Sequence, residues 1–142
     1  MTEQFVSHNV EETYEFGRQF AGRLAVGALV ALEGDLGAGK TALVRGIAKG
    51  LGVQDERMVS SPTYVLVQEY PCTLPIYHID LYRMRHPGPE LADLGLHEML
   101  AHGVVLIEWA ERAEKHLPRP FWRIRLEHSG LEERQLTISR VE

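Results

Sequence analysis

The spacing of hydrophobic positions changes several times along the chain, and each change predicts a different element. Apolar side chains recur every three or four positions across residues 9–25, which predicts an amphipathic helix with Asn9 as its N-cap. Uninterrupted apolar runs at 28–33 and 104–109 predict buried strands. Between these two strands, a second helical pattern extends from about residue 40 to residue 51.

Two further pairs of segments predict antiparallel hairpins. They are strands over 63–70 and 76–82, and strands over 121–128 and 134–141. A helix is predicted over 90–100, after His86-Pro87-Gly88-Pro89 breaks the chain. Because strands first alternate with helices and hairpins follow, we expect residues 1–142 to form a single three-layer α/β domain with a mixed sheet and added antiparallel hairpins.

Composition narrows the class of protein. Of the 142 residues, 44% are hydrophobic and 25% charged, as in ordinary globular proteins rather than disordered or fibrous ones. No apolar run approaches the roughly 20 residues of a membrane span, and the first residues lack the basic start of a secretory signal. A lone cysteine, Cys72, cannot form an internal disulfide, so we expect a cytoplasmic protein. A net charge of −5 argues against autonomous binding of nucleic acid.

The clearest chemical signal is GDLGAGKT at residues 34–41, which matches the pattern G-x-x-x-x-G-K-[ST]. Glycines let backbone N–H groups approach phosphate oxygens, and the helix that follows points its positive dipole end at the same anion. Lys40 then reaches the β- and γ-phosphates, and the Thr41 hydroxyl binds Mg²⁺. We therefore predict a P-loop NTPase-like fold with a phosphate-binding loop formed by Asp35, Leu36, Gly37, Ala38, Gly39, Lys40 and Thr41.

Mg²⁺ at such a loop usually needs an acid from the end of a neighbouring strand. Glu108 is the only acid in the apolar run 104–108 and stands at its C-terminal end, where ligands bind in open α/β sheets. Asp80 ends a similar apolar segment that begins at Ile76. The residues alone leave open which of the two acids is the main Mg²⁺ ligand.

Three other side chains are candidates for a nucleotide site. Thr63 belongs to the hydroxyl-rich segment Ser60–Thr63, which fits a switch segment near the γ-phosphate or an ordinary turn. Glu111 fits either an approach to the nucleotide or the start of a surface helix, and Arg134 fits a solvent-exposed strand start.

The sequence also argues against some ligands. Guanine-specific NTPases use an N-K-x-D segment, and the only asparagine of this chain is Asn9, so ATP is the expected nucleotide. The seven histidines show no metal-ligand spacing. Arg123 and Arg125 share one face of their strand, which we interpret as a solvent-exposed face.

Taken together, the segments resemble one protein family. The sequences GDLGAGKT (34–41), SPTY (61–64), YHIDLYR (77–83), DLGLHE (93–98) and LIEWAER (106–112) occur in the order and spacing of the TsaE/YjeE family. That family is the bacterial ATPase of tRNA threonylcarbamoyladenosine biosynthesis. The resemblance covers nearly the whole chain, and only the stretch Met84–Pro89 departs from the acidic character common there.

The resemblance implies a role for each candidate residue. Residues 36–41 would hold the ATP phosphates, and Lys40 would contact the β- and γ-oxygens. The remaining implied positions are Thr41 and Glu108 at Mg²⁺, Asp80 in hydrolysis, Thr63 in a switch-like segment, Glu111 and Arg134 near the nucleotide, and Asn9–Thr13 on the adenine side.

The resemblance also implies an activity with two levels. At the first, the chain would bind and hydrolyse Mg-ATP slowly, because neither a catalytic base nor a cis arginine finger is evident, and partners would complete the site. At the second, turnover would drive or reset a TsaB–TsaD complex that modifies adenosine 37 of tRNA, with tRNA contacted only through those partners. The alternatives are a nucleotide-gated switch without significant turnover and a small-molecule kinase.

Overall fold

A mixed β-sheet organises the computed structural model, which describes residues 2–34, 39–55, 59, 67–72 and 74–142. Within these residues the sheet has seven strands in the order β1-β7-β6-β2-β5-β4-β3. The strands are β1 (Thr2–Ser7), β2 (Leu29–Glu33), β3 (Val67–Tyr70), β4 (Ile76–Asp80), β5 (Val104–Glu108), β6 (Phe121–His128) and β7 (Arg134–Val141). The central strands β6, β2, β5 and β4 are mutually parallel, whereas β7, β1 and β3 pair antiparallel with their neighbours.

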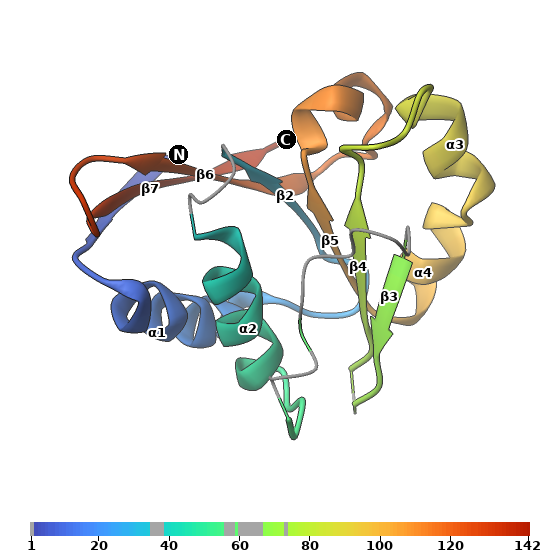
Figure 1. The fold of residues 1–142 in the computed structure, drawn as a ribbon. Coiled ribbons are helices and arrows are strands. Elements are labelled where there is room, and N and C mark those ends of the chain that lie inside the picture. The colour runs from blue at the N-terminus through green and yellow to red at the C-terminus, as the bar shows by residue number, and fades with distance from the viewer. Residues whose placement is uncertain (1, 35–38, 56–58, 60–66, 73) are drawn as a thin grey trace.

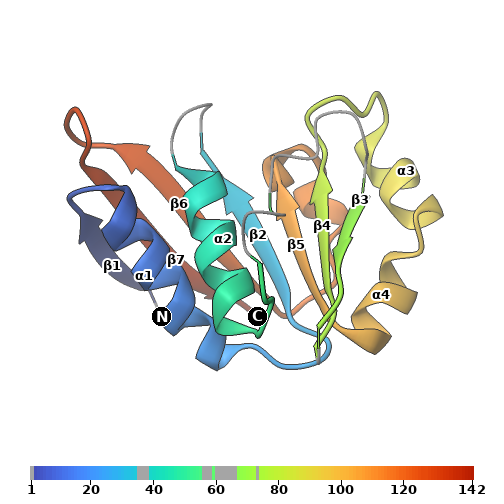
Figure 2. The same cartoon turned by 60° about the horizontal axis from the view of Figure 1, so that its bottom comes forward.

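Helices cover both faces of this sheet (Figures 1 and 2). They are α1 (Val10–Phe20), α2 (Lys40–Gly50), α3 (Pro87–Asp93) and α4 (Leu96–His102), with the 3₁₀ helices η1 (Ala21–Arg23) and η3 (Ala110–His116). One core lies under α1 and α2 and takes Val30 and Leu32 from β2. The other lies under α3, α4 and η3 and takes Leu29 and Ala31. Since alternate residues of β2 enter opposite cores, its apolar run is uninterrupted, and the three-layer mixed fold is confirmed.

Helices α1 and α2 approach closely because each presents a glycine to the other. A side chain added at Gly46 would collide with the carbonyl oxygen of Tyr14, and one added at Gly17 would collide with that of Leu43. The N-terminus of α1 is fixed by Asn9, whose Oδ1 accepts a hydrogen bond from the Glu12 N–H at 2.8 Å. The predicted N-cap is therefore confirmed.

Most predicted elements are present within the described residues, although 63–66 of the strand predicted over 63–70 lie outside them. The main differences are as follows. The helix predicted over 90–100 is wrong, because α3 already begins at Pro87 and a left-handed Gly95 separates it from α4. Proline is compatible with the first turn of a helix, so His86–Pro89 starts α3 instead of breaking the chain. The helix predicted over 9–25 ends earlier, at Phe20, and continues as η1. Strand β1 was not predicted, because most of its side chains are exposed and only its pairing with β7 defines it.

Candidate functional site

The carboxyl ends of the parallel strands meet at one edge of the sheet. There Glu108, the last residue of β5, pairs in register with Asp80 on β4 and with Leu32 on β2. Strand β2 leads through Gly34 into the glycine-rich sequence, which ends where Lys40 begins α2. Three predicted site residues, Lys40, Asp80 and Glu108, thus come together at the edge where ligands bind in such sheets.

Lys40 is buried at this edge and has two described contacts. Its Nζ donates a hydrogen bond to the carbonyl oxygen of Gly34 at 2.7 Å and lies 4.0 Å from the ring centroid of Trp109. Trp109 directly follows Glu108 in a left-handed backbone conformation, with φ of 59°, that is uncommon for a bulky residue. The turn after β5 therefore places an aromatic face against the lysine.

Glu108 is 3% exposed, and its carboxylate is in hydrogen-bond contact with the buried side chain of His78. The His78 Nε2 lies 2.5 Å from Glu108 Oε2, and the His78 Nδ1 lies 2.8 Å from the hydroxyl of Tyr70. Neither His78 nor Tyr70 is among the site residues predicted from the sequence. The available signal was the alternation of β4, which places His78 two residues before Asp80 and hence on the same face of the sheet.

Asp80 is more exposed than Glu108. Its Oδ1 accepts a hydrogen bond from the Tyr82 N–H at 2.8 Å. Burial raises the pKa of Asp80 above its ordinary value, the Tyr82 N–H opposes this rise, and the negative charge of Glu108 adds to it. The two candidate acids therefore lie side by side in different environments, one enclosed and one near solvent.

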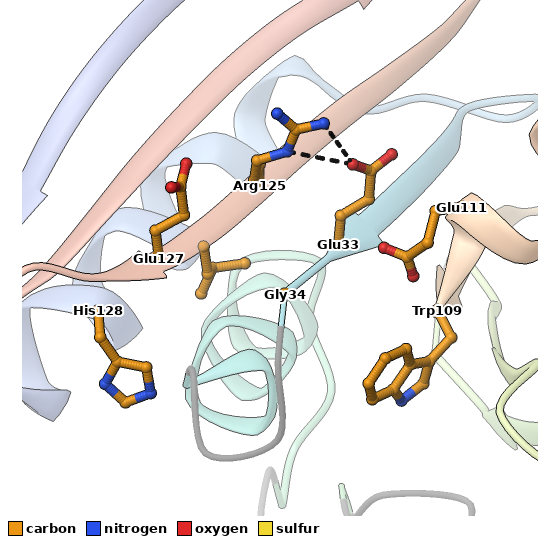
Figure 3. A pocket seen from close by; sticks show the side chains of 8 residues that line it. Glu33, Gly34, Trp109, Glu111, Arg125, Glu127 and His128 are labelled. Atoms are coloured by element: carbon orange, nitrogen blue, oxygen red, sulfur yellow. Dashed lines mark hydrogen bonds and ion pairs between the residues drawn. The ribbon is translucent and has the colours of Figure 1, made fainter.

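A cavity of about 640 Å³ opens beside the first glycine of the glycine-rich sequence (Figure 3). It is lined by Glu33, Gly34, Trp109, Glu111, Arg125, Leu126, Glu127 and His128. Glu111 is thus placed near the loop, and burial together with the negative charge of Glu33 raises its pKa.

The interpretation of Arg123 and Arg125 as a solvent-exposed face holds for Arg125, whose side chain is 55% exposed, and is wrong for Arg123. Glu33 is buried and accepts from Arg123 Nε at 3.0 Å and from Arg125 Nη2 at 3.0 Å. Arg123 also pairs with Glu114 of η3, so its side chain is only 25% exposed. The reason is tertiary, because parallel pairing places Glu33 opposite Arg125 and η3 covers that face of β6.

A second cavity, of about 190 Å³, borders the other end of the glycine-rich sequence. It is lined by Asn9, Val10, Thr13, Gly39, Ala42, Leu131, Glu132 and Arg134. Val10 and Leu131 are large apolar side chains that are mostly exposed here. The structure therefore brings Arg134 and the start of α1 next to Gly39, but not into the cavity that contains Glu111.

The other predicted residues divide into two groups. Thr41 is half-buried in the first turn of α2, directly after Lys40. Asp35, Leu36, Gly37, Ala38 and Thr63 lie outside the described residues. Across the described part of the chain, no cluster of three or more His, Cys, Asp or Glu side chains is arranged to hold a metal ion. The same part contains no helix long and apolar enough to cross a membrane.

The fold and the arrangement at this edge define a P-loop NTPase-like α/β protein. A family model described as "Threonylcarbamoyl adenosine biosynthesis protein TsaE" matches residues 7–136. The chain belongs to the TsaE family.

Individual relatives agree with this assignment. The tRNA threonylcarbamoyladenosine biosynthesis proteins TsaE of Bacillus subtilis (strain 168) and Treponema pallidum (strain Nichols) are 42% and 36% identical to this chain over 135 residues. These matches cover 94% of this chain, and 82% and 98% of the two relatives. The crystal structure of YdiB from B. subtilis superimposes with a TM-score of 0.81 at 35% identity, covering 100% of this chain and 87% of that one.

Proposed function

We propose that this protein is a Mg²⁺-dependent ATPase that serves the threonylcarbamoylation of adenosine 37 in tRNA. The observation that supports the chemistry is the meeting of Lys40 with Asp80 and Glu108 at the carboxyl edge of the parallel strands. Membership of the TsaE family supports the biological process. Residues 1–142 act in this proposal as one ATPase domain that works in the cytoplasm.

The residues at this edge fit a Mg²⁺ ion that shares its ligands with phosphate. Mg²⁺ in phosphate sites is typically held by one or two carboxylates or hydroxyls plus phosphate oxygens, rather than by an all-protein cage. The described residues offer that limited set, with Glu108 enclosed at the end of β5 and Thr41 at the start of α2. When bound, Mg²⁺ supplies positive charge that offsets negative charge on the transferring phosphoryl group.

Side chains and backbone groups of this protein perform the other steps of phosphate binding and hydrolysis. Lys40 contacts the β- and γ-phosphate oxygens, supported by backbone N–H groups of residues 35–39. Asp80 holds the attacking water. Its Oδ1 accepts a hydrogen bond from the Tyr82 N–H, which fixes the carboxylate, and the side chain is exposed enough for water to reach Oδ2. Thr63 contributes from the switch-like segment.

The two cavities suggest where the rest of the nucleotide lies. The smaller cavity has apolar walls from Val10 and Leu131 and ends at Arg134, which suits a purine ring and a ribose-phosphate. It borders Gly39, so a base there connects directly to phosphates on the loop. Glu111 faces the larger cavity, on the side of Gly34, and would approach the nucleotide from there.

Turnover by the isolated chain is slow in this proposal. The guanidinium groups of Arg123 and Arg125 on β6 are both held by Glu33, so neither is available as an arginine finger. A TsaB–TsaD complex completes the active geometry and bears most of the tRNA contact. The same observation favours one alternative, a nucleotide-gated switch in which ATP sets the affinity for partners without meaningful turnover.

ATP hydrolysis by the purified chain, alone and with TsaB and TsaD, tests the proposal. We expect slow hydrolysis that the partners stimulate and that Glu108→Ala abolishes. Glu98→Ala, an exposed acid on α4, is the matched control and should behave as wild type. ATP binding without hydrolysis under every condition would favour the switch, and phosphate transfer to an added acceptor would instead indicate a kinase.

A further inference from the structure

Within the described residues, one buried polar side chain has contacts in the site but no function assigned so far. The buried polar or charged residues there are Ser7, Thr13, Glu33, Lys40, His78 and Glu108. Ser7 and Thr13 hydrogen-bond each other, Glu33 binds two arginines, and Lys40 and Glu108 belong to the proposed site. His78, at 0% exposure in the middle of β4, remains to be explained.

His78 belongs to a row of side chains that crosses three adjacent strands. Its Nε2 contacts Glu108 Oε2 on β5 at 2.5 Å, and its Nδ1 contacts the Tyr70 hydroxyl on β3 at 2.8 Å. The Tyr70 hydroxyl also lies 2.7 Å from Gln68 Oε1. Both ring nitrogens of His78 are therefore engaged, and the imidazole is fixed in position and orientation.

This arrangement constrains the carboxylate of Glu108. An ionised carboxylate only accepts hydrogen bonds, so His78 Nε2 carries the hydrogen and donates it to Oε2. That bond engages Oε2 and restricts rotation of the carboxylate. Without a donor, a carboxylate that is 3% exposed would be an uncompensated buried charge.

We propose that His78 is a positioning residue that holds Glu108 for Mg²⁺, with Tyr70 and Gln68 fixing the imidazole. This inference rests on the proposed function, because it assigns Glu108 to the metal. Hydrogen bonds to metal-ligating carboxylates from outside the coordination sphere commonly contribute about 10–100-fold to metal affinity or activity. His78 acts only through Glu108, so it affects the metal and not the phosphate contacts of Lys40.

The test measures the coupling between Mg²⁺ and nucleotide. For each variant, the dissociation constant of ATP is measured in EDTA and in saturating Mg²⁺. The value in EDTA divided by the value in Mg²⁺ gives the ratio that reports the contribution of the metal to ATP binding. His78→Leu removes the donor, and we expect the ratio to fall about 10–100-fold while the constant in EDTA stays near the wild-type value. His78→Gln places an amide N–H near the Nε2 position, so the ratio should stay within about threefold of wild type.

Tyr70→Phe provides a second variant in case His78→Leu does not fold. It keeps the ring but removes the hydroxyl that fixes His78 Nδ1, and we expect a smaller fall in the ratio, of about three- to tenfold. Unfolding in urea, measured on the same samples, separates loss of metal coupling from loss of folded protein.

The outcomes separate the two proposals. If wild type binds ATP equally with and without Mg²⁺, or not at all, the proposed function is wrong. If wild type shows the coupling and folded His78→Leu or Tyr70→Phe retains it in full, the positioning role of His78 is wrong. A loss in His78→Gln equal to that in His78→Leu, with both folded, would also overturn it, since the restored donor should restore the coupling.

Discussion

At the scale of single residues, the candidate site depends on how a few charged side chains are enclosed. Lys40 packs on Trp109, Glu108 is held by His78, and Glu33 is neutralised by two arginines. Asp80 and Glu111 keep part of their surface in solvent and have raised pKa values. Each of these three enclosed charges has a polar, charged or aromatic contact, as burial requires, and the two acids with raised pKa values lie next to other acids.

The first prediction concerns Lys40 and its neighbour Trp109. Lys40→Ala should weaken ATP binding by at least about 2 kcal/mol, or about 30-fold, because a charge that faces phosphate in a partly dry site is lost. Lys49→Ala, at the exposed end of α2, is the control and should bind as wild type. Calorimetric titration with ATP measures both variants, and equal affinities would contradict the assignment of Lys40.

Trp109 offers an optical readout of the same contact. Because the Lys40 ammonium lies 4.0 Å from its ring centroid, ATP that attracts the lysine should change the emission of Trp109. Trp122→Phe removes the other tryptophan of the chain, so the signal in that background comes from Trp109 alone. If saturating ATP leaves the emission spectrum unchanged, ATP binding does not alter the contact between Lys40 and Trp109, and the prediction is wrong.

Glu111 gives a prediction on pH. Its raised pKa means that the folded state binds this proton more tightly than the unfolded chain, so stability falls as pH rises from the ordinary glutamate pKa through the raised value. Glu111→Gln removes the titrating group and should be slightly more stable than wild type at pH 7, because solvent at this exposed position screens most of the repulsion. Below about pH 4 the gain should disappear. Urea unfolding across this range measures it, and a gain independent of pH would refute the electrostatic cause.

At the scale of elements, close packing of α1 on α2 positions the start of both helices beside the glycine-rich sequence. The smaller cavity takes residues from each helix, Val10 from α1 and Ala42 from α2. Its geometry therefore depends on the glycines that let the helices approach. The break between α3 and α4 at Gly95 lies on the other face of the sheet.

The helix contact leads to a prediction on stability. Gly46→Ala should lower the free energy of unfolding by about 1–3 kcal/mol, because its side chain would overlap the Tyr14 carbonyl and force α1 and α2 apart. Gly22→Ala is the matched control, since no atom from elsewhere in the structure lies within 4 Å of the added carbon. Urea denaturation compares the two, and equal stability would show that the helices can separate without cost.

At the scale of the whole molecule, the net charge of −5 fits a protein that reaches tRNA through partners. We expect the isolated chain to bind tRNA no more tightly than a non-specific Kd of about 10⁻⁴–10⁻⁶ M, and to join a tight tRNA complex only with TsaB and TsaD present. Filter binding at physiological salt measures this. Tight binding by the chain alone would place the RNA contact on this protein.

Much of the fold and part of the site were predictable from local patterns. The strand predicted over 104–109 follows from an uninterrupted apolar run, and the hairpin of 121–128 with 134–141 follows from alternation and turn residues. Both signals are local in the chain. The differences have two causes, one local and one tertiary. Proline suits the first turn of a helix, so residues 86–89 begin α3 instead of breaking the chain. Strand β1, by contrast, exists only through its pairing with β7.

The sequence alone was enough to identify the motifs that consist of consecutive residues. The glycine–lysine–threonine sequence follows an apolar strand, and Asp80 and Glu108 each end a strand of their own. The order of the strands was decided only by the tertiary structure. That order brings His78 to Glu108 across 30 residues and Arg125 to Glu33 across 92, because strand neighbours are selected by packing of two apolar faces rather than by any local preference.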